Sequence, residues 1–323
     1  MIYYVYLAAE VVSVAEKGGA YALQVLIALL RGLLQNCLVI DFQDGRIQEA
    51  LGEHVRGMQP SFDRKLLSAT LGAIQKHNRF VCCLTPDLTG ATPDDEVMIQ
   101  QAAAALIDVA VLSTEAKPGS ELPAGLEIAT LATYQHTDFE PRRSKLASVG
   151  SRTEPGAQSQ TDFLDSHFRK ALRHASRIVL CDRLFGRKYG DNYEYTITKV
   201  LRWLEAVLDS PATCALEVHC ERPPGLGHRA LEGDLKAGRT GRLGSLRMTV
   251  YYYNNPGIED VLPHERFVLT DQFAFSIDRG LDFLDKSTKR NRDVSVRYAD
   301  ADSCQTTLRF FARKSPPTLA QIV

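Results

Sequence analysis

The first half of the chain alternates two kinds of hydrophobic pattern. Short runs rich in β-branched and aromatic residues, such as MIYYVYL at 1–7 and RFVCCLT at 79–85, are typical of buried strands. The segment 20–35 is apolar over most of its length and is typical of a largely buried helix. The same alternation continues through strands expected at 37–42 and 108–114 and helices expected at 46–57, 62–77 and 93–107. Strands that alternate with helices predict a parallel α/β sheet.

The second half begins with the same alternation and ends in closely spaced strands. Helical spacing covers 162–175 and 192–209, and the strand RIVLCD lies between them at 177–182. Further strands are expected at 214–221, 246–255, 263–271 and 272–278, a short helix with a glycine-rich loop at 229–246, and strands or partly helical segments at 294–300 and 307–313. This order predicts a second α/β sheet in which antiparallel pairing increases towards the end of the chain.

A polar segment separates the two halves. Residues 138–161, DFEPRRSKLASVGSRTEPGAQSQT, contain two prolines and two glycines and lack an apolar period, which is typical of a linker. We therefore expect an α/β fold in two domains, with a parallel sheet in 1–137 and a mixed sheet in 162–323.

Composition is that of a globular protein. Of 323 residues, 45% are hydrophobic and 24% are charged, and no run of 18 apolar residues predicts a membrane span. The N-terminal segment lacks a basic region and is interrupted by Glu10, Glu16 and Lys17, so a signal peptide is not expected. Seven scattered cysteines without a CxxC pair fit reduced thiols in a cytoplasmic protein and disfavour a zinc site.

Charge is distributed unevenly between the halves. The formal net charge is −1, but residues 1–150 carry 12 Lys and Arg against 17 Asp and Glu, and residues 151–323 carry 26 against 22. The second half is therefore the better candidate for binding an anion, although a surplus of this size is also common on an ordinary solvated surface.

The segment PHERFVLTD at 263–271 places chemically useful side chains close together. On a strand, residues two apart share a face, so His264 and Arg266 are expected to point the same way. Imidazole can act as a nucleophile or carry protons near neutral pH, and guanidinium can hold two phosphate oxygens at once. Asp271 closes the expected strand, where it could orient a base or cap a turn.

This spacing, His-x-Arg-x4-Asp, resembles the His-x-Lys-x4-Asp signature of the phospholipase D superfamily, with arginine in place of lysine. Together with RIVLCDRLFG at 177–186 and the turn Asp-Arg-Gly-Leu-Asp at 278–282, it resembles the phospholipase-D-like C-terminal domain of microtubule-interacting-and-trafficking proteins. The resemblance covers about half of the chain, over residues 162–290.

Three alternative functions follow from this resemblance. In catalytic members, one histidine attacks phosphorus and a histidine from a second motif protonates the leaving oxygen, so a single motif implies a homodimer that brings two copies of His264 together. The first hypothesis is thus a dimeric phosphodiesterase, most plausibly a nuclease, of the kind found in bacterial defence or toxin systems by analogy. The second is a non-catalytic module that binds a phosphorylated ligand, nucleic acid or anionic lipid, and a third is a structural subunit with a vestigial motif.

Other residues of the second half could extend such a site. Arg279 in the Asp-Arg-Gly-Leu-Asp turn and Arg183 and Arg187 after RIVLCD are candidate phosphate ligands, and Asp182 follows a strand, where α/β sites usually lie. The run Tyr251–Tyr253 could stack on bases or sugars, but such a run more often divides between core and surface.

The first half shows a weaker resemblance to PIN-type ribonuclease domains, in DDEVMIQQAAAALIDVAVLSTE at 94–115. The resemblance implies carboxylates for Mg²⁺ or Mn²⁺ at Asp95 and Glu115, with Glu49 or Glu53 as a further ligand. The aspartate expected in the first strand is absent, so we expect a degenerate, inactive scaffold and no bound metal. No Walker-type loop, GxGxxG, HExxH or GxSxG occurs, and no cofactor is expected.

Overall fold

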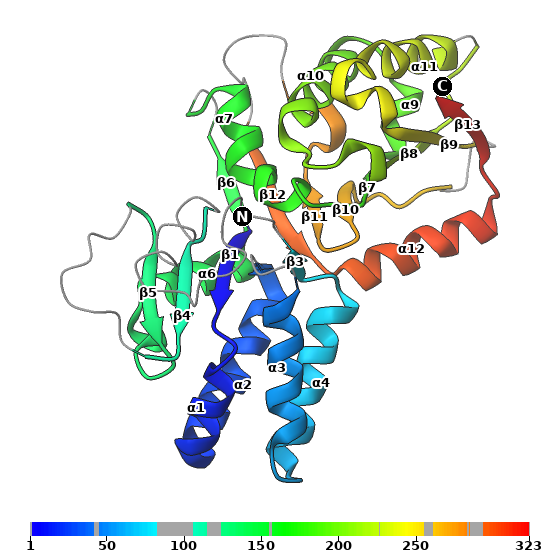
Figure 1. The fold of residues 1–323 in the computed structure, drawn as a ribbon. Helices are drawn as coiled ribbons and strands as arrows, with labels where there is room; N and C mark the ends of the chain where they lie inside the picture. Colours follow the sequence, from blue (N-terminus) through cyan, green and yellow to red (C-terminus); the bar gives the residue numbers. More distant parts are fainter. Residues whose placement is uncertain are drawn as a thin grey trace. The chain divides into compact units, whose positions relative to one another are not determined.

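The computed structural model describes residues 2–41, 45–82, 106–114, 124–154, 157–225, 227–254, 261–282, 284 and 293–322. The chain divides into two compact units, residues 2–147 and residues 148–323. Both units are α/β, the first with a parallel sheet and the second with a mixed sheet, which confirms the expected fold class (Figure 1).

The 2–147 unit contains a five-stranded parallel sheet in the order β3-β2-β1-β4-β5. Its strands are β1 Tyr3–Leu7, β2 Cys37–Asp41, β3 Phe80–Cys82, β4 Val109–Leu112 and β5 Glu127–Thr130. Every residue of β2 and β4 is buried, because helices or neighbouring chain segments cover both faces. Burial on both faces explains why these strands appear in the sequence as continuous apolar runs.

Four helices connect the first three strands of this sheet. They are α1 Val11–Lys17, α2 Gly19–Asn36, α3 Arg46–Gly57 and α4 Phe62–Lys76. α4 begins where Ser61 accepts a hydrogen bond from the backbone N–H of Arg64, at 3.1 Å. α2, α3 and α4 match the helical segments expected from the sequence, whereas α1 was not expected.

The segment 138–161 differs from the expected linker. It contains the helix α6, Phe139–Val149, and the short strand β6, Ser151–Thr153, and the boundary between the two units falls within α6 at Ser148. Phe139 is fully buried, and its ring contacts the ring of Tyr3 at 5.1 Å. A single apolar anchor gives no periodic signal, so the helix could not be recognised from the hydrophobic pattern.

The 148–323 unit contains an eight-stranded sheet in the order β13-β9-β8-β7-β10-β11-β12-β6. Besides β6, its strands are β7 Arg177–Cys181, β8 Ala215–Glu221, β9 Arg247–Tyr253, β10 Phe267–Thr270, β11 Ala274–Ile277, β12 Val294–Ala299 and β13 Thr318–Ile322. β7, β8 and β9 are parallel, and all other neighbours pair antiparallel. The sequence correctly predicted that antiparallel pairing increases in the last part of the chain.

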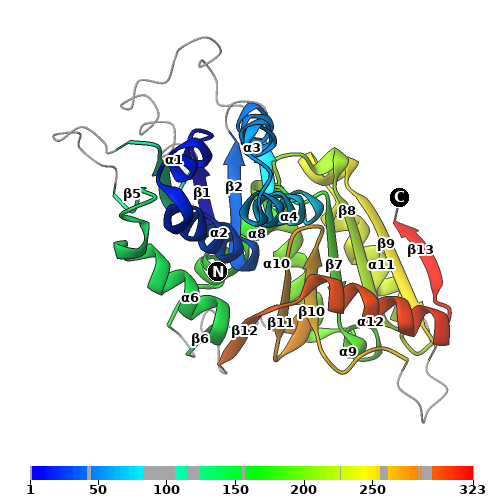
Figure 2. The ribbon, with the colours of Figure 1, turned by 90° about the horizontal axis from the view of Figure 1, so that it is seen from below.

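Helices cover both faces of this sheet (Figure 2). They are α7 Gln160–Leu164, a π-helical turn η2 at Asp165–Arg169, α8 Lys170–Leu172, α9 Arg183–Arg187, α10 Asp191–Val207, α11 Gly227–Gly238 and α12 Ala301–Lys314, with short 3-10 turns η3 Pro211–Thr213, η4 Gly241–Ser245 and η5 Gly280–Asp282. α12 packs on one face through Cys304 and Leu308, which join a buried cluster with Val179, Phe267 and Leu269. On the opposite face, α7, η2, α8 and α10 pack over Leu180 and Val268.

The end of the chain differs in part from the sequence expectation. Residues 307–313 are helical within α12, which is one of the two alternatives expected for them, whereas the strand β13 was not expected. The six described cysteines are free, and all except Cys82 are buried, as expected for reduced core thiols. Among the described residues, no helix combines the length and apolar character that a membrane-spanning segment requires.

Candidate functional site

A groove of about 530 Å³ lies on the sheet face that carries α12, over β11 and β12 and beside the turn that precedes β10. Its lining residues are His264, Glu265, Arg266, Ser276, Ile277, Asp278, Ser295, Arg297 and Ala299. Ligand sites of small molecules typically occupy about 300–1,000 Å³, so the groove has the size of such a site. Two of the residues singled out in the sequence, His264 and Arg266, therefore border the same hollow.

His264 and Arg266 reach the groove from a turn and not from a strand. β10 begins at Phe267, one residue after Arg266, and the backbone N–H of Ile277 donates to the Arg266 carbonyl at 2.9 Å. His264 is exposed and Arg266 is half-buried. The intervening Glu265 lines the groove as well, so the expected strand alternation of His264 and Arg266 does not describe this segment.

Arg266 is anchored inside the unit. Its Nε lies 3.7 Å from the buried carboxylate of Asp182, and its Nη1 donates to the Asp278 carbonyl at 2.8 Å. Asp182 also caps α9, accepting a hydrogen bond from the backbone N–H of Leu184 at 2.9 Å. The guanidinium therefore links the end of β7 to the turn after β11, and much of its hydrogen-bonding capacity is used within the protein.

Gly280 allows this close arrangement. Its backbone has φ of +67°, and a Cβ at this position would lie 2.3 Å from Asp182 Oδ2 and 2.4 Å from Arg266 Cδ. The glycine of the Asp-Arg-Gly-Leu-Asp turn is thus required both for its left-handed conformation and for the approach of the ion pair.

Arg297 is the cation of the groove that the sequence analysis missed. It stands on β12 opposite Ser276 of β11, and both residues line the groove. No described residue forms a hydrogen bond or ion pair with its guanidinium, in contrast to Arg266. The alternation VSVRYA indicates that Arg297 lies on a face opposite to that of Val294 and Val296, but the sequence does not reveal that this face meets His264.

Asp271 is not brought to the groove. It lies at the other end of β10, about 16 Å along the strand from Arg266 at the usual rise per residue. Its carboxylate accepts hydrogen bonds from the backbone N–H and hydroxyl of Ser176, at 3.1 and 2.8 Å. Asp271 thus ties the β10–β11 turn to the start of β7, and the His-x-Arg-x4-Asp spacing does not describe one cluster of side chains.

The other basic candidates lie outside the groove lining. Arg183 Nε is 3.6 Å from the buried carboxylate of Glu221, and Arg187 Nη1 is 3.9 Å from it. Arg279 pairs with Asp282 of η5 at 3.6 Å. The buried Tyr193 phenol lies near this second pair, and its pKa is raised by burial and then by the charges of Asp182 and Asp282. Each of these arginines stabilises a carboxylate within the unit.

The tyrosine run divides between core and surface. Tyr252 and Tyr253 are buried, and Tyr251 is half-buried and stacks on His219 with ring centroids 4.3 Å apart. His219 Nδ1 is 3.1 Å from the Tyr253 hydroxyl, and Nε2 is 3.4 Å from Glu217. Burial lowers the pKa of His219, so this imidazole is neutral at neutral pH and belongs to the sheet packing.

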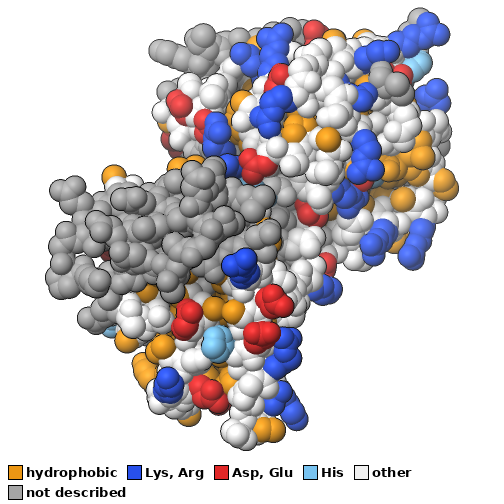
Figure 3. Space-filling model, in the orientation of Figure 1, with side chains coloured by type: hydrophobic (Ala, Val, Ile, Leu, Met, Phe, Trp, Pro, Cys, Tyr) orange, Lys and Arg blue, Asp and Glu red, His pale blue; other side chains and the backbone are white. Residues whose placement is uncertain are grey.

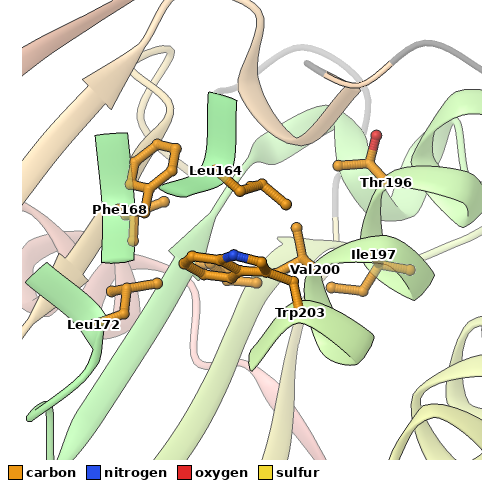
Figure 4. Close-up of a pocket in the computed structure, with 9 residues that line it drawn as sticks. Leu164, Phe168, Leu172, Thr196, Ile197, Val200 and Trp203 are labelled. Atoms are coloured by element: carbon orange, nitrogen blue, oxygen red, sulfur yellow. The ribbon is translucent and has the colours of Figure 1, made fainter. Parts of the chain in front are cut away.

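A second cavity is too small and too apolar to be a ligand site. It lies between η2 and α10 and holds about 20 Å³, and its lining includes Leu164, Phe168, Val200 and Trp203 (Figure 4). The Trp203 indole N–H donates to Asp165 at 2.7 Å, which leaves an apolar lining. A space of this size accommodates about one water molecule and offers it no polar partners.

The structure does not test whether the four carboxylates proposed for the first half lie close together. Asp95 and Glu115 lie outside the described residues, and Glu49 and Glu53 are exposed on α3. The described residues contain no group of three or more His, Cys, Asp or Glu side chains that could hold a metal ion. The metal ligands implied for this half therefore stay a prediction.

Comparison with known proteins adds no family. No protein-family model matches the chain, and a search of the curated proteins found no match.

Proposed function

We propose that the 148–323 unit binds a phosphorylated ligand in the groove over β11 and β12 without cleaving it. The observation that carries this proposal is the Arg297 guanidinium, which faces the groove and has no partner among the described residues. The hydroxyls of Ser276 and Ser295 and the imidazole of His264 line the same space. Guanidinium, hydroxyl and imidazole groups are the usual donors to phosphate oxygens.

The arrangement of Arg266 favours binding over catalysis. The phospholipase D-like mechanism implied by the sequence uses a cation at this position to hold the reacting phosphoryl group, whereas Arg266 is bonded to Asp182 and to the Asp278 carbonyl. It also uses two imidazoles, and His264 is the one histidine among the described residues that line the groove. The dimeric phosphodiesterase, and the nucleic acid partner that it implies, stay predictions.

The test of binding compares two arginines. Calorimetric titration of the full chain with glycerol 3-phosphate should give saturable binding that falls at least tenfold in Arg297→Gln, since a charge-assisted contact is worth about 1.5–3 kcal/mol. Arg309→Gln is the matched control, because Arg309 is exposed on α12 and outside the groove lining. Equal binding by the Arg297→Gln variant and the native chain would refute the proposal.

A second assay addresses bond cleavage. The native chain should not hydrolyse bis(p-nitrophenyl) phosphate or single-stranded DNA and RNA, with or without EDTA. Metal-independent hydrolysis that disappears in His264→Ala would contradict the non-catalytic assignment and support the phosphodiesterase.

A further inference from the structure

The groove combines its unpartnered arginine with carboxylates. Glu265 and Asp278 line the same space as Arg297, and both are exposed. No described lysine, arginine or histidine lies within ion-pair distance of either carboxylate. A ligand whose phosphate contacts Arg297 therefore also lies close to two negatively charged carboxylates.

The neighbouring strand adds charges of both signs. Arg152 on β6 stands opposite the groove residue Ser295, and it pairs with Asp293 and Glu154. The charges at and beside the groove are those of three arginines, Arg152, Arg266 and Arg297, and four carboxylates, Glu154, Glu265, Asp278 and Asp293. Among the described residues, the groove thus has no surplus of positive charge.

Charges are mixed elsewhere on this unit as well. On the face shown in Figure 3, Lys and Arg side chains of the 148–323 unit occur singly and in small groups, and they do not form one continuous stripe. Proteins that track nucleic acid backbones present a continuous positive groove. The described surface in that view does not have this character.

We infer that the phosphorylated ligand is a small zwitterion: a phosphate ester that carries an ammonium group beside the phosphate. This inference rests on the proposed function and adds the chemistry of the second end of the ligand. Arg297 and His264 receive the phosphate, and the carboxylates of Glu265 and Asp278 accept hydrogen bonds from the ammonium group. A purely anionic ligand would bring its charge close to the same two carboxylates without compensation.

An ammonium group fits these carboxylates better than a metal ion does. The described residues contain no group of three or more His, Cys, Asp or Glu placed to hold a metal. Two carboxylates that flank an open space are sufficient for an ammonium group, which donates up to three hydrogen bonds.

The experiment compares two probes of similar size in the full chain. Phosphoethanolamine carries the ammonium group, and glycerol 3-phosphate replaces it with hydroxyls. In calorimetric titrations at low salt, phosphoethanolamine should bind about fivefold more tightly, as expected for a partly exposed ion pair. In the double variant Glu265→Gln, Asp278→Asn the preference should disappear, and Arg297→Gln should weaken both probes.

The control for the double variant is Glu194→Gln. Glu194 is exposed on α10, against the opposite face of the sheet, and this change should leave the preference intact. Thermal unfolding of each variant in parallel distinguishes a lost ligand contact from a lost fold.

The other possible outcomes distinguish a failure of the zwitterion inference from a failure of the proposed phosphate binding, on which it rests. Equal or tighter binding of glycerol 3-phosphate, still dependent on Arg297, would overturn the zwitterion and leave phosphate binding in place. Tight binding of a ten-residue oligothymidylate whose affinity falls steeply with salt would also overturn the zwitterion, because the ligand would then be a polyanion. Failure of all probes to bind, or binding that is unaffected by Arg297→Gln, would refute the proposed function itself.

Discussion

At the scale of single residues, two arginines that line the same groove have different environments. Arg266 lies in the motif that attracts attention, yet it is held by Asp182 and by the Asp278 carbonyl. Arg297 belongs to no motif, yet its guanidinium faces the groove without a described partner. We therefore expect Arg266 to govern stability and Arg297 to govern binding.

Substitution of each arginine by alanine tests this division. Arg266→Ala removes the ion pair of Arg266 with the buried Asp182 carboxylate, which should lower the free energy of unfolding by about 3 kcal/mol. Arg297→Ala removes an exposed side chain without a described partner and should change the free energy of unfolding by less than about 0.5 kcal/mol. Urea denaturation of both variants measures the difference, and a stability loss in Arg297→Ala equal to that in Arg266→Ala would contradict it.

At the scale of elements, α6 and β13 were the largest surprises. α6 has few apolar positions and depends on Phe139 and on Arg143, which is buried and bonded to Glu140, to the Gly32 carbonyl and to Gln35. β13 follows two prolines and is exposed along most of its length, and it is a strand because β9 offers it an unpaired edge. Neither segment carries a periodic pattern of its own.

Truncation of Phe139 tests whether α6 belongs to the 2–147 unit. Phe139→Ala should lower the free energy of unfolding of that unit by about 3–4 kcal/mol, because it empties a fully buried aromatic site. Val149→Ala, near the exposed end of the same helix, is the control and should have little effect. Hydrogen exchange should show lost protection in β1 and α2, and unchanged protection there would argue that α6 is dispensable.

At the scale of the whole molecule, each unit has its own sheet and its own network of polar side chains that are at least half-buried. In the 148–323 unit this network joins Arg177, Glu217, His219 and Tyr253 across β7, β8 and β9. Burial acts to raise the pKa of Glu217, but hydrogen bonds from Arg177 and His219, together with the Arg177 charge, outweigh it and lower the pKa to about 2. Burial lowers the pKa of His219, which remains neutral beside it.

These shifts make the stability of the 148–323 unit depend on pH. A carboxyl group with a depressed pKa stabilises the fold above its unfolded value near 4.5, and this stabilisation is lost as the pH falls from about 4.5 towards 2. Glu217 is partly solvated, so we expect a contribution of about 1–2 kcal/mol after screening. The depressed pKa of His219 adds a loss of the same sign as the pH falls below its unfolded value.

Denaturation of the native chain and of Glu217→Gln between pH 7 and pH 3 measures this contribution. The variant should be less stable at pH 7 and should lose less stability on acidification than the native chain. Parallel pH profiles for the two proteins would show that Glu217 does not contribute.

The sequence by itself determined the class of fold and most of its elements. Strands such as β2 and β4 are buried on both faces and helices such as α10 on one face, so hydrophobic spacing identifies them. Only the tertiary structure decided which polar residues meet. The antiparallel register of β10, β11 and β12 brings Arg297 to the groove that His264 also lines, and Asp271 lies at the far end of β10. Pairing between strands leaves no signal in local sequence spacing.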